Sequence, residues 1–189
     1  PAVRKVKNHL LEISFARFHG KPDPALAAEF QAFRDRSSAW LPDYCLFKLL
    51  MEIHGPHLTW DEWPEDSRNP NDARELIASM RNKHPAHIAS RLDYFAYAQW
   101  LCFHQWLDLR SYANSRGVKL MGDLTIGVSF HSTDVFFNRS EFHTNWFCGT
   151  PPESYSAENP FCHEWGQNWG IPLYNWEAMA QNSFTWWRE

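Results

Sequence analysis

The chain has 189 residues and a formal net charge of −4, and its 11 Trp, 14 Phe and 6 Tyr make it rich in aromatic rings. Disorder of the whole chain is excluded, because it would leave all this ring surface in water. With 18 basic and 22 acidic residues there is no broad cationic surface, and no apolar run approaches the ~20 residues that span a bilayer. We therefore expect neither nucleic acid nor a membrane as a partner. The N-terminus lacks the apolar region of a secretory signal, which predicts a cytoplasmic protein.

The first part of the chain is predicted to be helical. Apolar residues between Val3 and Phe18 recur close to one helical face, and His19–Pro22 ends that segment. Asp23 and Pro24 are then of the residue types preferred at the N-cap and first position of a second helix. A third helix is expected from about Pro42 to His54.

Two more helices are expected after an irregular aromatic connection at Trp60–Pro64. The first is short, from about Asn71 to Asn82. The second is the longest of the chain, from about Pro85 to Ser115, because its apolar residues recur at near-helical spacing. Gly117 supplies the left-handed position that commonly follows the last turn of a helix.

One segment, Val118 to Ser129, has the dense and partly β-branched apolar content of a parallel strand buried on both faces. A charged Asp123 inside such a strand is costly unless the strand end is open to a ligand or the carboxylate has a dedicated partner. A structural role, capping nearby backbone N–H groups, is an equal alternative. The residues from Phe130 to Gly170 show no clear period, and a helix is expected from about Asn175 toward Trp187.

The stretch Glu164–Trp176, EWGQNWGIPLYNW, combines aromatic rings, carboxamides and glycines in one segment that we expect to be irregular. Aromatic faces pack on the C–H faces of sugars, and amides hydrogen-bond to vicinal hydroxyls, so the composition indicates glycan binding. In the alternative, the rings lie in the core and the amides satisfy backbone groups. The residues concerned are Trp165, Gln167, Asn168, Trp169, Tyr174, Asn175 and Trp176.

The cysteines give no support for a disulfide framework or a metal site. Cys45, Cys102, Cys148 and Cys162 are widely spread and show no CxxC pair, which is typical of reduced thiols. A zinc site built from Cys148, Cys162 and their neighbouring histidines would lack the two tight knuckles that structural zinc sites usually have. We therefore expect no metal.

Several motifs together resemble one known family, the 4-α-glucanotransferases of glycoside hydrolase family 77, called amylomaltases in bacteria and disproportionating enzymes in plants. Their order and spacing along the chain carry the resemblance, which covers roughly residues 28 to 189. Phe136 departs from the family's usual Trp, Thr125 from its Pro and Glu153 from its Asp. The matching segments are Trp40–Phe47, Trp60–Pro64, Gln99–Trp106, Ala113–Val128, Ser132 with Asp134, Pro151–Pro152 and Gly166–Trp176.

The resemblance implies an α/β fold that is part of a (β/α)₈ barrel with a mainly helical inserted subdomain. Residues 1–115 would be that subdomain. Residues 116–189 would hold one barrel strand, a long substrate loop and the following helices. Members of the family transfer α-1,4-glucan segments between sugars with retention, through a covalent glycosyl-enzyme intermediate. The three carboxylates that do this chemistry match no residue of this chain, so we expect no catalytic residue and an inactive fragment.

The remaining candidates face the substrate, an α-1,4-glucan or maltooligosaccharide, and no cofactor is expected. One alternative is a non-catalytic carbohydrate-binding module that uses Trp165, Trp169 and Trp176 as a stacking platform. Another is a helical interaction domain in which these rings are core. The predicted substrate-binding residues are Asp123, Asp134, Gln167, Asn168, Trp169 and Tyr174.

Overall fold

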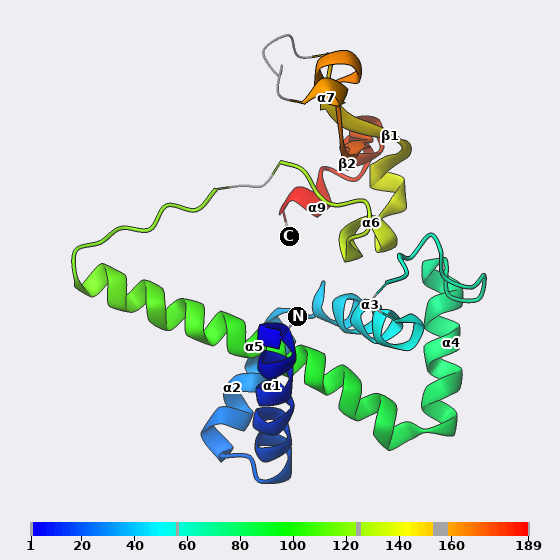
Figure 1. Ribbon diagram of the computed structural model, residues 1–189. Helices are drawn as coiled ribbons and strands as arrows, with labels where there is room; N and C mark the ends of the chain where they lie inside the picture. The colour runs from blue at the N-terminus through cyan, green and yellow to red at the C-terminus, as the bar shows by residue number, and fades with distance from the viewer. Residues whose placement is uncertain (1, 56, 124–125, 153–158, 189) are drawn as a thin grey trace. The chain divides into compact units, whose positions relative to one another are not determined.

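The computed structural model describes residues 2–55, 57–123, 126–152 and 159–188 (Figure 1). The chain divides into two compact units, which are described separately. One comprises Pro1–Pro56 and Ala73–Gly122, and the other His57–Asp72 and Asp123–Glu189. No helix in the described part of the chain has the length and hydropathy to cross a membrane.

The first unit is helical, as the sequence predicts. The side chain of Asp23 accepts hydrogen bonds from the backbone N–H groups of Ala25 at 2.8 Å and Leu26 at 3.3 Å, which confirms it as an N-cap. Gly55, with φ of 90°, follows the third helix. The helices are α1 (Ala2–Gly20), α2 (Pro24–Arg36), α3 (Leu41–His54), most of α4 (Pro70–Lys83) and α5 (Pro85–Ser115).

Helix α5 is the long element against which α1, α2 and α3 pack. Its bounds, Pro85 and Ser115, are those that the sequence predicts. Gly117 adopts a φ of 75°, and its N–H donates to the carbonyl oxygen of Asn114 at 3.0 Å. The N–H of Val118 donates to the carbonyl oxygen of Ala113, also at 3.0 Å. These bonds satisfy carbonyls of the last turn, so the helix ends where the glycine allows.

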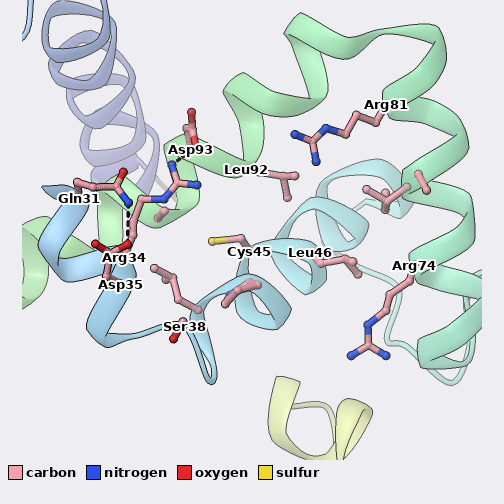
Figure 2. A pocket seen from close by; sticks show the side chains of 15 residues that line it. Gln31, Arg34, Asp35, Ser38, Cys45, Leu46, Arg74, Arg81, Leu92 and Asp93 are labelled. Atoms are coloured by element: carbon pink, nitrogen blue, oxygen red, sulfur yellow. Dashed lines mark hydrogen bonds and ion pairs between the residues drawn. The ribbon is translucent and has the colours of Figure 1, made fainter. Parts of the chain in front are cut away.

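The core of this unit is largely aromatic where α1 and α2 meet α5. Phe18 of α1 lies 4.9 Å from Tyr97 and 5.5 Å from Trp100 between ring centroids, and Phe30 of α2 lies 5.8 Å from Trp100. By contrast, the apolar stripe at the start of α1 is largely exposed, since it packs against nothing in the described residues of the unit. A pocket of about 510 Å³ lies among α2, α3, α4 and α5 (Figure 2).

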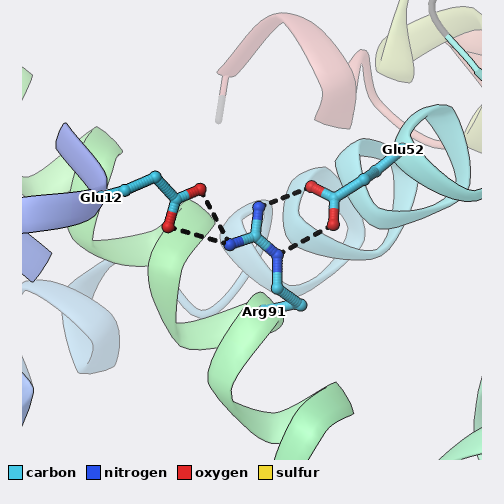
Figure 3. A network of polar contacts seen from close by, with 3 residues as sticks. All are labelled: Glu12, Glu52 and Arg91. Atoms are coloured by element: carbon cyan, nitrogen blue, oxygen red, sulfur yellow. Dashed lines mark hydrogen bonds and ion pairs between the residues drawn. The ribbon is translucent and has the colours of Figure 1, made fainter. Parts of the chain in front are cut away.

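Arg91 of α5 ties three helices together (Figure 3). Its Nη1 lies 3.0 Å from a carboxylate oxygen of Glu12 on α1. Its Nε and Nη2 donate to the two carboxylate oxygens of Glu52 on α3, at 2.9 Å and 2.5 Å. The guanidinium also lies over the ring of Tyr94, with 4.4 Å from Cζ to the ring centroid. A planar fork of donors is suited to this double role.

The second unit is built around an antiparallel sheet of β1 (Phe142–Thr150) and β2 (Gln167–Tyr174). Phe142 pairs with Tyr174 and Thr150 with Gln167, with two register irregularities between them. A Cβ at Gly149 would lie 1.8 Å from the carbonyl oxygen of Gln167, so only glycine allows the strands to approach this closely. The short helical elements are α6 (Thr133–Phe137), η1 (Arg139–Glu141), α7 (Pro160–Trp165), α8 (Trp176–Gln181) and α9 (Thr185–Arg188).

Aromatic packing holds the start of this unit together. The Nε1 of Trp60 donates to the carbonyl oxygen of Phe130 at 2.8 Å. Phe136, at the position where the family usually has Trp, is fully buried, with its ring 5.7 Å from that of Trp63. Arg139 covers Trp60, with 4.4 Å between Cζ and the ring centroid, and burial lowers the pKa of its guanidinium.

Four expectations about this region are wrong. The described residues of Val118–Ser129 form no paired strand, because a parallel strand needs neighbours that none of the described residues supplies. The region Phe130–Gly170 holds β1 and the start of β2, and Glu164–Trp176 is largely strand. The expected last helix is divided into α8 and α9 at Ser183 and Phe184, whose φ values are 60° and 56°. Thr125 and Glu153 lie outside the described residues.

Candidate functional site

Three of the predicted substrate-binding residues, Gln167, Asn168 and Trp169, begin β2 and are exposed. The indole Nε1 of Trp169 lies 3.0 Å from Oε1 of Gln167, to which it donates. The Oδ1 of Asn168 accepts from the N–H of Gly170 at 2.9 Å. Half of the Trp169 surface is accessible, 52%, so its ring is oriented by a hydrogen bond without being buried. This is the arrangement that stacking on a sugar requires.

The preceding residue, Gly166, positions the start of the strand. It has a φ of 80°, and a Cβ there would lie 2.1 Å from the carbonyl oxygen of Thr150. Only glycine combines this conformation with so close an approach of backbone. The glycines of the GQNWG segment therefore place Gln167 and Trp169, as the composition of the stretch suggests.

A fourth candidate, Tyr174, lies at the other end of β2 in a cluster of aromatic rings. Its hydroxyl donates to the carbonyl oxygen of Ile126 at 2.9 Å. Burial raises the pKa of the phenol above its ordinary value, and Cys148 and Asp134 act in the same direction. The rings within 6 Å of Tyr174, measured between centroids, are Phe142, Trp176, Trp186 and Trp187.

Asp134 joins the same cluster through one hydrogen bond. It lies in α6, whose N-cap is Ser132, and its Oδ1 accepts from Nε1 of Trp186 at 3.2 Å. The ring of Trp186 lies 5.8 Å from that of Tyr174. The polar atoms of Tyr174 and Asp134 thus bond to other groups of this unit. Each of these two residues helps to position the indole rings around it.

The structure therefore brings the candidates together in two groups. Gln167, Asn168 and Trp169 form one, and Asp134 with Tyr174 forms the other. Trp169 and Tyr174 are five residues apart on one strand, which corresponds to roughly 16 Å at ~3.3 Å per residue.

Asp123 belongs to neither group. It is exposed, and no hydrogen bond or ion pair joins its carboxylate to another residue in the described part of the chain. The expectation that it lies within a buried strand is wrong, since the paired strand is absent. An exposed carboxylate is solvated by water and needs no protein partner. Asp123 therefore does not carry the desolvation cost that a buried strand would impose.

Sequence reasoning missed other aromatic rings of this unit, one of them exposed and two half-buried. Trp146 of β1 is 68% exposed, and the strand that carries it was not predicted. Trp186 and Trp187 were seen only as part of a helix, although they lie against Tyr174. The signal for them is the density of Trp in the last residues of the chain. His131 lies at the edge of Phe130, with its Nε2 3.5 Å from Oδ1 of Asp61.

The first of these groups presents an accessible indole beside two amide side chains. An exposed indole bonded to an amide suits a polyhydroxylated ligand with apolar C–H faces. Apolar surface of this kind on a folded unit commonly marks a binding site. Within the described residues there is no group of three or more His, Cys, Asp or Glu arranged to hold a metal ion.

Comparison with known proteins identifies the family. The family model of glycoside hydrolase family 77, described as 4-alpha-glucanotransferase, matches residues 1–189. A 4-alpha-glucanotransferase of Thermus thermophilus is 34% identical over 183 residues, which cover 94% of this chain and 34% of the relative. A chloroplastic/amyloplastic 4-alpha-glucanotransferase of Solanum tuberosum is 34% identical over 158 residues, covering 79% of this chain and 25% of the relative. The chain belongs to the 4-alpha-glucanotransferase family and spans 34% of the length of the first relative and 25% of the second.

A solved structure supports the fold. An amylomaltase from Streptococcus agalactiae, determined in complex with acarbose, superimposes with a TM-score of 0.77 at 24% sequence identity. The match covers 97% of this chain and 35% of that one. The fold of the chain thus matches that of one part of an amylomaltase. The family match favours an enzyme segment over an independent binding or interaction module.

Proposed function

We propose that this chain is the part of a 4-α-glucanotransferase that binds α-1,4-glucan, and that the exposed face at the start of β2 is where it does so. The observation that carries the proposal is the pair of Trp169 and Gln167, an oriented and accessible indole in a family of glucan-transferring enzymes. The whole enzyme would transfer maltooligosaccharide units between donor and acceptor sugars, with retention, in the cytoplasm.

In this proposal the two groups have different tasks. Trp169 and Gln167 contact the sugar directly, with Asn168 stabilising the strand that carries them. Tyr174 and Asp134 hold the aromatic cluster, and Asp123 would reach the glucan from the preceding segment. Excluding water with rings of this kind favours transfer to a sugar over hydrolysis.

None of the 189 residues is assigned a catalytic role. Retaining transfer needs a carboxylate nucleophile and a second carboxylic acid, and in this family a third carboxylate that stabilises the charged transition state. We propose that these lie elsewhere in the enzyme, beyond the helical subdomain (1–115) and the strand and loop segment (116–189).

The test is a titration of the 189-residue chain with maltoheptaose, in which binding is monitored by NMR. We expect chemical-shift changes at Gln167 and Trp169, weaker binding for Trp169→Ala, and no release of glucose from maltotriose. Tyr112→Ala is the control, because Tyr112 is a similarly exposed ring in the other unit. Equal losses in the two variants, or glucose release by the unaltered chain, would contradict the proposal.

A further inference from the structure

The helical unit contains a pocket whose chemistry differs from that of the β2 face. It has a volume of about 510 Å³, within the range of small-molecule sites. Its floor is apolar: Leu41, Cys45, Ile77 and Ala96 are buried there, and Leu92 adds to it. Within the described residues, no aromatic ring lines it. A floor without rings is poorly suited to stacking on a sugar.

Three arginines stand around this floor. Arg34 of α2 is held by Asp93, with 2.7 Å between Nη1 and Oδ1. Arg74 of α4 donates from Nη2 to both carboxylate oxygens of Asp43, at 2.9 Å each. The charges of these two guanidiniums are therefore matched by carboxylates of the same unit.

Arg81 of α4 is different. In the part of the chain that the structure describes, no carboxylate or carbonyl oxygen forms an ion pair or hydrogen bond with its guanidinium. Figure 2 shows Arg81 pointing from α4 toward Leu92, and Asp35 on the opposite, α2 side of the pocket. The Oδ1 of Asp35 accepts from Nε2 of Gln31 at 2.8 Å. One end of the pocket thus offers an exposed, fork-shaped cation that pairs with no carboxylate in the described part of the chain, beside an apolar surface.

From this arrangement we propose that the helical unit has a second ligand site, which takes a small organic anion with a hydrocarbon body. The acidic head, a carboxylate or a phosphate monoester, pairs with Arg81, since a guanidinium binds both in a bidentate manner. The hydrocarbon body covers Leu92, Ile77 and Cys45. This site lies outside the residues proposed to bind glucan.

The experiment is a set of NMR titrations of the 189-residue chain with simple probes. Benzoate has the head and the body, benzamide has the body without the charge, and acetate has the charge without the body. Phenyl phosphate distinguishes the two kinds of head, and maltotriose tests for a sugar. We expect benzoate or phenyl phosphate to shift amide signals of Leu92, Ile77 and Cys45, with benzamide and acetate at least ten-fold weaker.

Two variants and one control complete the test. Arg81→Gln should weaken the binding of the anionic probe at least five-fold, and Arg110→Gln, an exposed arginine on α5, should leave it unchanged. Ala78→Leu should block binding by filling the pocket while keeping every charge. The proposal would be overturned if benzamide and benzoate bound equally well, or if the Arg81→Gln variant bound the anionic probe as well as the original chain. It would also be overturned if the shifts lay outside the pocket, if maltotriose bound there more tightly, or if no probe caused a shift.

Discussion

Trp169 donates its indole N–H to the side-chain oxygen of Gln167 across 3.0 Å, and both residues lie on the exposed part of β2. Residues two apart on a strand point to the same face, so the two side chains stand next to each other. The bond holds the edge of the indole while its ring face stays accessible. The hydrogen bond therefore fixes how the two side chains are oriented relative to each other.

Loss of the amide should weaken glucan binding even though the indole remains. In the proposed complex Gln167 contacts the sugar directly, and one hydrogen bond contributes about 1 kcal/mol net, so Gln167→Ala should lower the affinity of the chain for maltoheptaose roughly five-fold. The indole N–H signal of Trp169 should shift in the NMR spectrum of the free variant. Gln105→Ala, an exposed amide on α5, is the control. If both the affinity for maltoheptaose and the indole signal of Trp169 were unchanged, Gln167 would have no role in orienting Trp169 or in binding the sugar.

Trp169 and Trp63 should differ sharply in their effect on stability. Trp63 is fully buried, and replacing a buried Trp by Ala costs about 3–5 kcal/mol. Trp169 is half exposed, so Trp169→Ala should lower the free energy of unfolding by less than about 1 kcal/mol. Urea denaturation of the two variants measures both values. A large loss of stability at Trp169 would show that its ring belongs to the core and not to a sugar site.

The hydroxyl of Tyr174 should stabilise the fold in a pH-dependent manner. Tyr174→Phe keeps the ring packing and removes the bond to Ile126, which should cost about 1 kcal/mol. The folded pKa is raised, so this contribution is fully present below the ordinary pKa of 10.0 and is lost as the pH rises through the raised value. The difference between the two proteins in urea denaturation should be constant from pH 6 to 9 and shrink above pH 10. A constant difference up to pH 11 would contradict this assignment.

Arg91 should contribute to stability through its geometry as well as its charge. Lysine keeps the charge and lacks the fork that reaches Glu12 and Glu52 together, so Arg91→Lys should lower the free energy of unfolding by about 1 kcal/mol. Both glutamates are partly exposed, and the loss should be smaller in 1 M NaCl. Arg17→Lys, an exposed position on α1, should have no effect. An equal effect of the two substitutions would exclude a special role for the network.

Cys45 should resist alkylation in the folded chain. Burial raises the pKa of its thiol to about 12, and the thiolate is the reactive species. With iodoacetamide at pH 8, mass spectrometry should show modification of the exposed Cys102 long before that of Cys45. Both should react at similar rates in denaturing urea. Rapid labelling of Cys45 without denaturant would indicate that α3 opens away from α5.

The helices were predictable because their signals are local. Asp23 with Pro24 marks the start of α2, and Gly117 marks the end of α5, so each of these helix ends is determined within a few residues. The sheet depends on partners that are distant in sequence. β1 carries exposed residues at successive positions and two register irregularities, so it lacks the alternation by which a strand is recognised. For Val118–Ser129, apolar content predicts a strand, while pairing requires neighbours that the described chain does not provide.

The candidate site was predictable to a similar extent. The composition of Gln167, Asn168 and Trp169 indicated sugar recognition, and all three are exposed. That Tyr174 would be enclosed by Trp186 and Trp187 was not visible, because these rings meet only after the chain turns at Ser183 and Phe184. Nor did any sequence signal predict the arginine-lined pocket, since its lining comes from four separate helices.

The close approach at Gly149 also limits how this surface can be altered. Any side chain there meets a backbone oxygen, which cannot rotate aside as another side chain does. A library that randomises Gly149 together with its neighbours should therefore yield folded members only where this glycine is retained. Substitutions that the fold tolerates are therefore confined to the outward-facing side chains. The spacing of the two strands stays the same because Gly149 is kept.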